Sequence, residues 1–139
     1  MTAFELHPQL AADTEVIGDL PLCRVLLMND ANYPWLILVP RRADTREVYE
    51  LSIGQQGLLW GEVTEVGENM MQQFDGHKLN IAALGNMVPQ LHIHVIVRYE
   101  NDPAWPGPVW GAQAAQPYEA ADLEERRKAI TELFNLQTR

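Results

Sequence analysis

Residues 90–97, which read QLHIHVIV, alternate polar and apolar side chains. Such alternation is typical of a β-strand, because successive side chains of a strand point to opposite faces of its sheet. A strand over residues 91–98 places Gln90, His92 and His94 on one face, while the apolar residues between them can anchor the other face in a core. The fold must therefore give this strand one face that packs and one that carries three polar side chains.

Short runs rich in Val, Ile and Leu predict four more strands, at residues 15–18, 22–28, 35–39 and 78–83. The residues at 29–32 tolerate a turn, so the second and third strands are expected to form an antiparallel hairpin. Ser52 and Gln55 form a capping box that predicts the start of a helix. Asp75-Gly76 is its expected end, because glycine can adopt the left-handed conformation that closes a helix. A final helix is predicted over residues 119–136.

The first helix has an apolar stripe with spacings of three and four, formed by Leu59, Val63, Val66, Met70 and Phe74. Its glutamates are expected to face mainly elsewhere: Glu62, Glu65 and Glu68. Residues 99–110 contain three prolines, a glycine and two tryptophans. They predict an irregular, packed segment, because proline is excluded from a regular helix interior or a central strand.

The length of 139 residues and the 47% hydrophobic content predict one domain, residues 1–139, with a substantial core. Cys23 lies in an apolar run and is expected to be a small buried residue. The sequence has no basic-plus-apolar leader pattern and no apolar run long enough to cross a bilayer, so a cytoplasmic protein without a membrane partner is expected.

The formal net charge of −9 argues against a nucleic-acid partner, because such a chain repels phosphate backbones at long range. A small phosphorylated ligand needs only a local group of donors. Residues 40–42 (Pro-Arg-Arg) and Arg98 can supply positive potential for it, or they can be ordinary surface arginines.

The two histidines of the alternating strand suit chemistry at phosphorus. A neutral imidazole attacks when one ring nitrogen is unprotonated and the other donates its proton to a fixed acceptor, for which a neighbouring backbone carbonyl can serve. His92 can attack while His94 donates to a phosphate oxygen or to the departing group. The preceding loop, with Gly85, Asn86 and Met87, adds flexible backbone and an amide that can bind phosphate oxygens.

Two other interpretations of the histidine pair remain open. The residues can be half-exposed strand histidines without a role. They can also chelate Zn or Cu, but such a site needs a third or fourth ligand, and the two remaining histidines, His7 and His77, lie in no recognisable ligand motif. The sequence therefore predicts no metal ion and no cofactor.

Residues 88–98, which read VPQLHIHVIVR, resemble the signature of the histidine-triad (HIT) proteins. The similarity extends over about residues 15–110, since the hairpin ending at Pro40, the helix after Ser52, the strand with Asn80 and the Gly85-Asn86 loop occur in the family's order. The resemblance implies an α+β fold: a five-stranded antiparallel sheet with a long central helix and a C-terminal helix. It also implies a homodimer.

The resemblance further implies a hydrolase or transferase that cleaves a nucleotide substrate at its α-phosphorus, such as a dinucleoside polyphosphate or a nucleoside phosphoramidate. His92 corresponds to the nucleophile that forms a nucleotidyl-histidine intermediate, and His94 to the histidine that contacts the phosphate or leaving group. Asn86, Asn80 and the backbone of residues 85–87 correspond to further substrate contacts. The expected partner is a purine nucleotide or a nucleotide conjugate.

Three positions depart from the family pattern. Gln90 replaces the first histidine of the triad, and its amide cannot be protonated. Trp35 stands where the family usually has a histidine, and it can pack at the base or nucleoside pocket. Met87 occupies a position where some members carry a serine. These departures keep an alternative open, in which the chain is a catalytically weak or inactive nucleotide-binding or interaction protein of the same fold.

Overall fold

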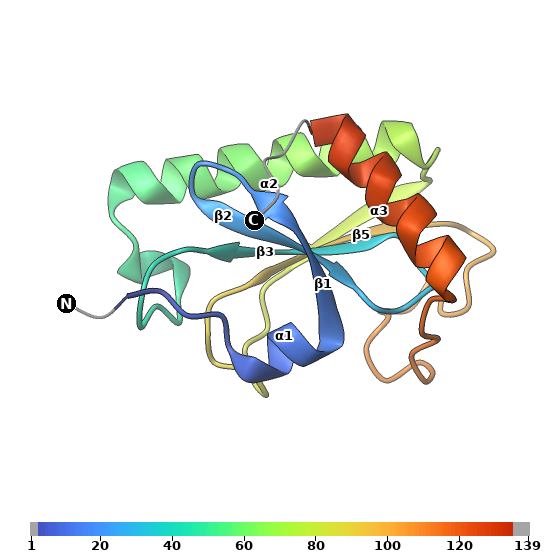
Figure 1. The fold of residues 1–139 in the computed structure, drawn as a ribbon, viewed down its shortest axis with the longest axis horizontal. Helices are drawn as coiled ribbons and strands as arrows, with labels where there is room; N and C mark the ends of the chain where they lie inside the picture. The colour runs from blue at the N-terminus through green and yellow to red at the C-terminus, as the bar shows by residue number, and fades with distance from the viewer. Residues whose placement is uncertain (1–2, 135–139) are drawn as a thin grey trace.

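The computed structural model describes residues 3–134. In chain order its elements are α1 (Pro8–Asp13), β1 (Thr14–Asp19), β2 (Cys23–Met28), β3 (Trp35–Pro40), a short 3-10 helix η1 (Val48–Glu50), α2 (Ile53–Gln73), β4 (Lys78–Ala82), β5 (Ile93–Arg98) and α3 (Ala120–Phe134). The strands form one sheet in the order β1-β2-β3-β5-β4, in which every neighbouring pair is antiparallel (Figure 1). The predicted α+β class, five-stranded antiparallel sheet, long central helix and C-terminal helix are confirmed.

The fifth strand begins at Ile93, two residues later than the alternation predicts. Its partner β3 ends at Pro40, which has no N–H group to continue the ladder. The N–H of Leu91 instead donates to the carbonyl of Thr45 across 2.9 Å. His94 therefore lies in the strand, whereas Gln90 and His92 precede it. In the final helix, the predicted residues 135–136 lie outside the described part of the chain.

The long helix α2 begins as predicted and ends differently. The hydroxyl of Ser52 accepts from the N–H of Gln55 at 3.2 Å, and the Gln55 side chain accepts from the N–H of Ser52 at 3.0 Å, which completes the capping box. At the other end, Asp75 rather than Gly76 takes the left-handed conformation, with φ of 49°. Gly76 is needed for space, since a Cβ there would lie 2.5 Å from a methyl carbon of Val97.

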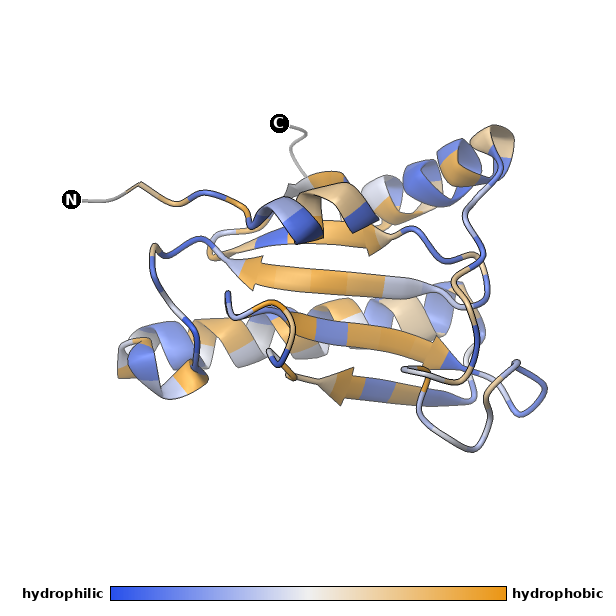
Figure 2. Cartoon of the chain, turned by 90° about the horizontal axis from the view of Figure 1, so that it is seen from below, coloured by the Kyte–Doolittle hydropathy of each residue, from blue (hydrophilic) through white to orange (hydrophobic). Residues whose placement is uncertain are grey.

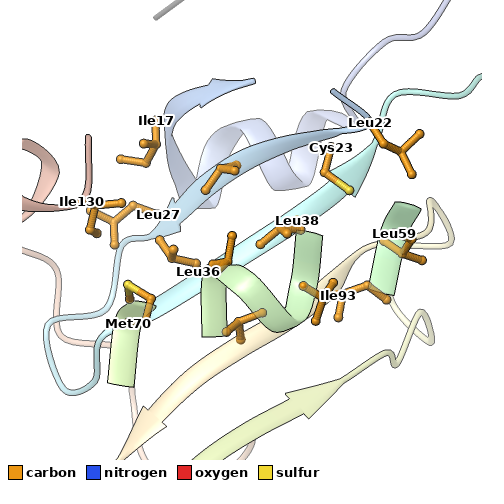
Figure 3. Close-up of a cluster of buried hydrophobic side chains, with 14 of the residues drawn as sticks. Ile17, Leu22, Cys23, Leu27, Leu36, Leu38, Leu59, Met70, Ile93 and Ile130 are labelled. Atoms are coloured by element: carbon orange, nitrogen blue, oxygen red, sulfur yellow. The ribbon is translucent and has the colours of Figure 1, made fainter. Parts of the chain in front are cut away.

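One face of the sheet, which we call the helix face, is covered by α2 and α3 (Figure 1). Strand residues such as Leu36 and Leu38 meet Leu59 and Met70 of α2 there (Figure 3). Cys23 and Ile130 of α3 belong to the same cluster, and both are fully buried. Burial of this aliphatic surface is the main driving force for the two helices to pack on the sheet.

Glu62 of α2 corrects the expectation that the helix glutamates face away from the core. Its side chain is buried among the residues of the helix face. Its two carboxylate oxygens accept hydrogen bonds from the backbone N–H groups of Leu22 and Cys23, at 2.8 and 2.9 Å. The carboxylate therefore satisfies two buried donors at the start of β2.

The opposite face, which we call the site face, is covered by α1, the segment before it and the irregular segment after β5. Its core is richer in aromatic rings, with Tyr33 and Trp35 in the same cluster as strand residues Ile37 and Ile96. The strands are mostly hydrophobic, whereas the loops and the outward sides of the helices are more polar (Figure 2). No helix within residues 3–134 is long and apolar enough to span a bilayer.

Candidate active site

His92 and His94 lie side by side on the site face, the first immediately before β5 and the second within it. Their ring centroids are 5.0 Å apart with an interplanar angle of 68°, and the residues are only 7% and 6% exposed. Leu91, Ile93 and Val95, which alternate with the two histidines, are buried in the core of the helix face, as the alternation predicts. These buried neighbours therefore hold the two imidazoles in a fixed relation.

The tautomer of His92 follows from its hydrogen bond. Its Nδ1 lies 2.6 Å from the backbone carbonyl oxygen of Gln90. A carbonyl oxygen only accepts, so Nδ1 must carry the proton and donate it. In the neutral ring, Nε2 then holds an unshared electron pair, which is the state required of a nucleophile.

His94 is surrounded by two indole rings. The indole N–H of Trp35 donates to Nδ1 of His94 across 3.0 Å, and the ring of Trp110 lies 5.1 Å away in an edge-to-face arrangement. Burial, with a smaller contribution from the nearby His92, lowers the pKa of His94 to about 4. His94 is therefore neutral at pH 7.

The sequence analysis expected Trp35 to pack at the base or nucleoside pocket, but it missed the bond from Trp35 to His94 and the place of Trp110 at the site. Trp35 is only 4% exposed, and its indole bonds directly to His94. Trp110 comes from the irregular segment, whose sequence has no periodic pattern that would predict its path over the sheet. The richness of that segment in tryptophan and proline was the one available hint of a packed role.

The side chain of Gln90 binds the N-terminal segment. Its amide oxygen accepts from the backbone N–H of His7, and its amide nitrogen donates to the carbonyl of Glu5, both at 2.8 Å. The backbone carbonyl of the same residue holds His92. A cavity of about 450 Å³ lies beside Gln90, and its lining includes Glu5, His7 and Arg46.

The loop before β5 is more exposed than the histidines. Gly85 adopts a φ of +83°, and Asn86 and Met87 are exposed, the latter at 93%. Neither side chain forms a hydrogen bond with the two histidines in the described part of the chain. Asn80 lies opposite Ile96 and so shares the histidine face, but its amide oxygen accepts from Arg98 across 2.8 Å.

Arg98 is not available to a phosphate, contrary to the expectation of a local positive patch. It is only 1% exposed, and its guanidinium donates to Asp102 at 2.8 and 3.0 Å and to the carbonyl of Gly107 at 2.9 Å. Burial alone would raise the pKa of Asp102, but the hydrogen bonds from Arg98 and from three backbone N–H groups together lower it to about 2. Arg98 therefore fixes the irregular segment onto the sheet. Arg41 is also engaged within the protein, because it donates to the backbone carbonyls of Leu20 and Pro21.

The two remaining histidines lie apart from the pair. Nδ1 of His7 accepts from the N–H of Gln9 at 3.0 Å and caps α1, while His77 faces Glu100 at 3.8 Å and the ring of Trp105. Within residues 3–134, no group of three or more His, Cys, Asp or Glu side chains is placed to hold a metal ion.

Comparisons with known proteins agree on the kind of domain. The family model described as HIT domain matches residues 9–101. A histidine triad protein from Marinobacter aquaeolei is 52% identical, with a TM-score of 0.94 over 96% of this chain and 98% of that chain. Histidine triad proteins from Bradyrhizobium japonicum and Sinorhizobium meliloti are each 46% identical, with TM-scores of 0.92 and 0.90; the matches cover 94% and 93% of this chain and 98% and 96% of theirs. No curated protein matches the chain.

Proposed function

The chain belongs to the histidine-triad (HIT) family, and on that premise we propose that it is a hydrolase or transferase that cleaves nucleotide substrates at the α-phosphorus. The observation that carries the proposal is the hydrogen bond from Nδ1 of His92 to the carbonyl of Gln90, at 2.6 Å. In the neutral ring this bond leaves the electron pair on Nε2, beside a second imidazole that is neutral at pH 7.

The proposed reaction has two displacements at phosphorus. In the first, the electron pair on Nε2 of His92 forms a P–N bond while the P–O or P–N bond to the leaving group breaks. The leaving group departs with that bonding pair and takes a proton from solvent. In the second, a water or another acceptor attacks the phosphorus through oxygen, loses a proton to solvent and releases the nucleotide from His92.

The other site residues would act on the oxygens of the transferred group. His94 donates a hydrogen bond to a phosphoryl oxygen, where negative charge grows in the transition state. Asn86, Asn80 and the backbone N–H groups of residues 85–87 are the proposed further contacts. Gln90 orients His92 through its backbone carbonyl and the N-terminal segment through its side chain.

The proposed partner is a purine nucleotide or a nucleotide conjugate, and the proposed assembly is a homodimer. The dimer is supported by the family resemblance and by the position of β4, an edge strand with Ile81 39% exposed. Analytical ultracentrifugation would measure the molecular mass in solution, and a monomer at micromolar concentration would contradict the dimer.

The test of the enzyme proposal compares the wild-type protein with His92→Asn. Both are incubated with an adenosine phosphoramidate and a dinucleoside polyphosphate, while AMP release is followed and adenylylated protein is trapped by acid quenching. The matched control is His77→Asn, which removes an exposed imidazole. We expect turnover in the wild type and the control, and a loss of at least about 10³-fold in His92→Asn.

Two results would contradict the proposal. Equal turnover in His92→Asn and the wild type would exclude His92 as the nucleophile. No cleavage of either substrate, with equal AMP binding by both forms, would instead favour the nucleotide-binding protein of the same fold.

A further inference from the structure

Trp35 makes a hydrogen bond that allows only one direction of donation. An indole has a single N–H group and no ring acceptor, so it can donate to His94 but cannot accept from it. The 3.0 Å distance from the indole nitrogen of Trp35 to Nδ1 of His94 therefore requires an electron pair on Nδ1. In a neutral His94, the proton must then lie on Nε2, at the edge of the ring that Trp35 leaves free.

We propose that Trp35 is a positioning residue that fixes His94 as the Nε2–H tautomer, so that His94 acts as a permanent hydrogen-bond donor to the phosphoryl group held at His92. The donor role rests on the proposed function, whereas the tautomer does not. An imidazole at position 35 can donate or accept and can take up a proton. An indole at that position gives Nδ1 of His94 one fixed role.

The packing around Trp35 holds the indole in this orientation. Tyr33 and Trp110 contact its ring edge-to-face, with centroid distances of 6.2 and 6.1 Å, and Trp35 lies opposite Ile96 in the sheet. Rotation of the indole would require these neighbours to move as well. The hydrogen bond is therefore part of a packed cluster rather than a contact between mobile side chains.

The surroundings of His94 also favour its neutral form. Its strand neighbours across the sheet are Ile37 and Ala82, and both indole rings that touch it are uncharged. The titratable group that faces it is His92, and a proton on His92 disfavours a second proton on His94. His94, with its tautomer fixed by Trp35, can therefore donate a hydrogen bond without changing its charge during the reaction.

The first measurement is ¹⁵N NMR of the imidazole nitrogens in ligand-free protein, which reports which nitrogen carries the proton. Wild-type His94 is expected to show a protonated Nε2 and an unprotonated Nδ1 at pH 7. Trp35→Phe keeps an aromatic ring but removes the N–H, and we expect a mixture of tautomers. The matched control is Trp110→Phe, which alters the other indole beside His94 and should leave the tautomer unchanged.

Kinetics then separate positioning from folding. Trp35→Phe should lower kcat by roughly tenfold with little change in KM, because a donor to the phosphoryl oxygens matters most in the transition state. Trp35→His should recover part of that loss, since an imidazole can also donate to Nδ1. If Trp35 had a merely structural role, its substitution would change thermal stability, but kcat would not fall separately from KM and Trp35→His would not restore kcat.

The outcomes distinguish this proposal from the enzyme proposal. A proton on Nδ1 of wild-type His94, or an unchanged tautomer in Trp35→Phe, would overturn it whether or not the protein turns over substrate. If the tautomer behaves as expected but no substrate is cleaved, the enzyme proposal fails. In that case the donor role of His94 is tested by AMP binding, and Trp35→Phe should bind AMP roughly tenfold more weakly than the wild type. Equal AMP affinity of the two proteins would overturn the role of His94 as a donor to phosphate.

Discussion

The two faces of the sheet bury their side chains in different ways. On the helix face, fully buried aliphatic residues such as Leu36 of β3 and Val63 of α2 pack between the sheet and two regular helices. On the site face, irregular segments cover rings and polar groups, and the buried polar side chains His92, His94 and Arg98 each have a specific hydrogen-bond partner. Aliphatic packing is nearly non-directional, whereas hydrogen bonds require a fixed geometry.

This difference implies a division of labour within one small sheet. Substitutions on the helix face should lower the free energy of unfolding and leave the site intact in the molecules that remain folded. Substitutions on the site face should lower the free energy of unfolding and also disturb the site, because the groups that stabilise the covering segments also position the histidines.

The largest effect is expected for Arg98→Leu on the site face. The substitution leaves the carboxylate of Asp102 buried without its guanidinium partner, and breaking such a pair costs about 3–5 kcal/mol of unfolding free energy. The irregular segment that carries Trp110 should loosen and turnover should fall. Urea denaturation measures the loss, with the exposed Arg46→Leu as a control. A loss below about 1 kcal/mol would show that the pair does not hold the segment.

The next prediction compares two neighbours on opposite faces. Leu36→Ala and Ile37→Ala each remove buried methyl groups and should each cost about 3 kcal/mol. Ile37 lies opposite His94, so its substitution should also lower kcat by about tenfold in the folded fraction. Leu36→Ala should leave kcat within about twofold of the wild type. Equal kcat in both variants would break the proposed division.

The neutral, buried His94 should make the protein less stable in mild acid. Its pKa is lowered from 6.5 to about 4 in the folded state, so between these values the unfolded chain binds a proton that the folded chain does not. Stability is fully present above pH 6.5 and falls as the pH drops, by about 2 kcal/mol at pH 5. Asp102, whose pKa is lowered from 3.8 to about 2, contributes only below this window.

Urea denaturation at pH 7, 6 and 5 would measure this slope. His94→Gln removes the titrating group but keeps an acceptor for Trp35, and it should flatten the dependence between pH 7 and 5. An equal slope in the two proteins would assign the acid sensitivity to other groups.

The sequence predicted the features that depend on near neighbours. The alternation around His92 and His94, the capping box at Ser52 and the apolar stripe of α2 involve residues a few positions apart, and the structure confirms them. The sequence did not predict the bond from His7 to Gln90 or the bond from Trp35 to His94, whose partners lie 83 and 59 residues apart in the chain. Such pairs depend on strand order and on how covering segments cross the sheet, which no local pattern encodes.

On the helix face, the local pattern likewise failed to predict the position of Glu62. Substitution of Glu62 is expected to have the smallest effect on stability of the changes considered. Helical spacing placed it away from the core, but its carboxylate accepts from the N–H groups of Leu22 and Cys23. Glu62→Gln keeps the shape and loses one acceptor oxygen, so one N–H is left facing an amide nitrogen. We expect a cost of about 1–2 kcal/mol, located at the start of β2.

Cys23 itself can report this local loosening. Burial, together with the neighbouring Glu62, raises the pKa of its thiol, and the side chain is fully buried, so a thiol reagent reaches it only when the segment opens. Labelling of Cys23 should therefore be about 5- to 30-fold faster in Glu62→Gln than in the wild type. Glu68→Gln, an exposed glutamate on the same helix, should leave the rate unchanged. An unchanged rate in Glu62→Gln would mean that the carboxylate does not hold the strand, and that aliphatic packing alone secures the helix face.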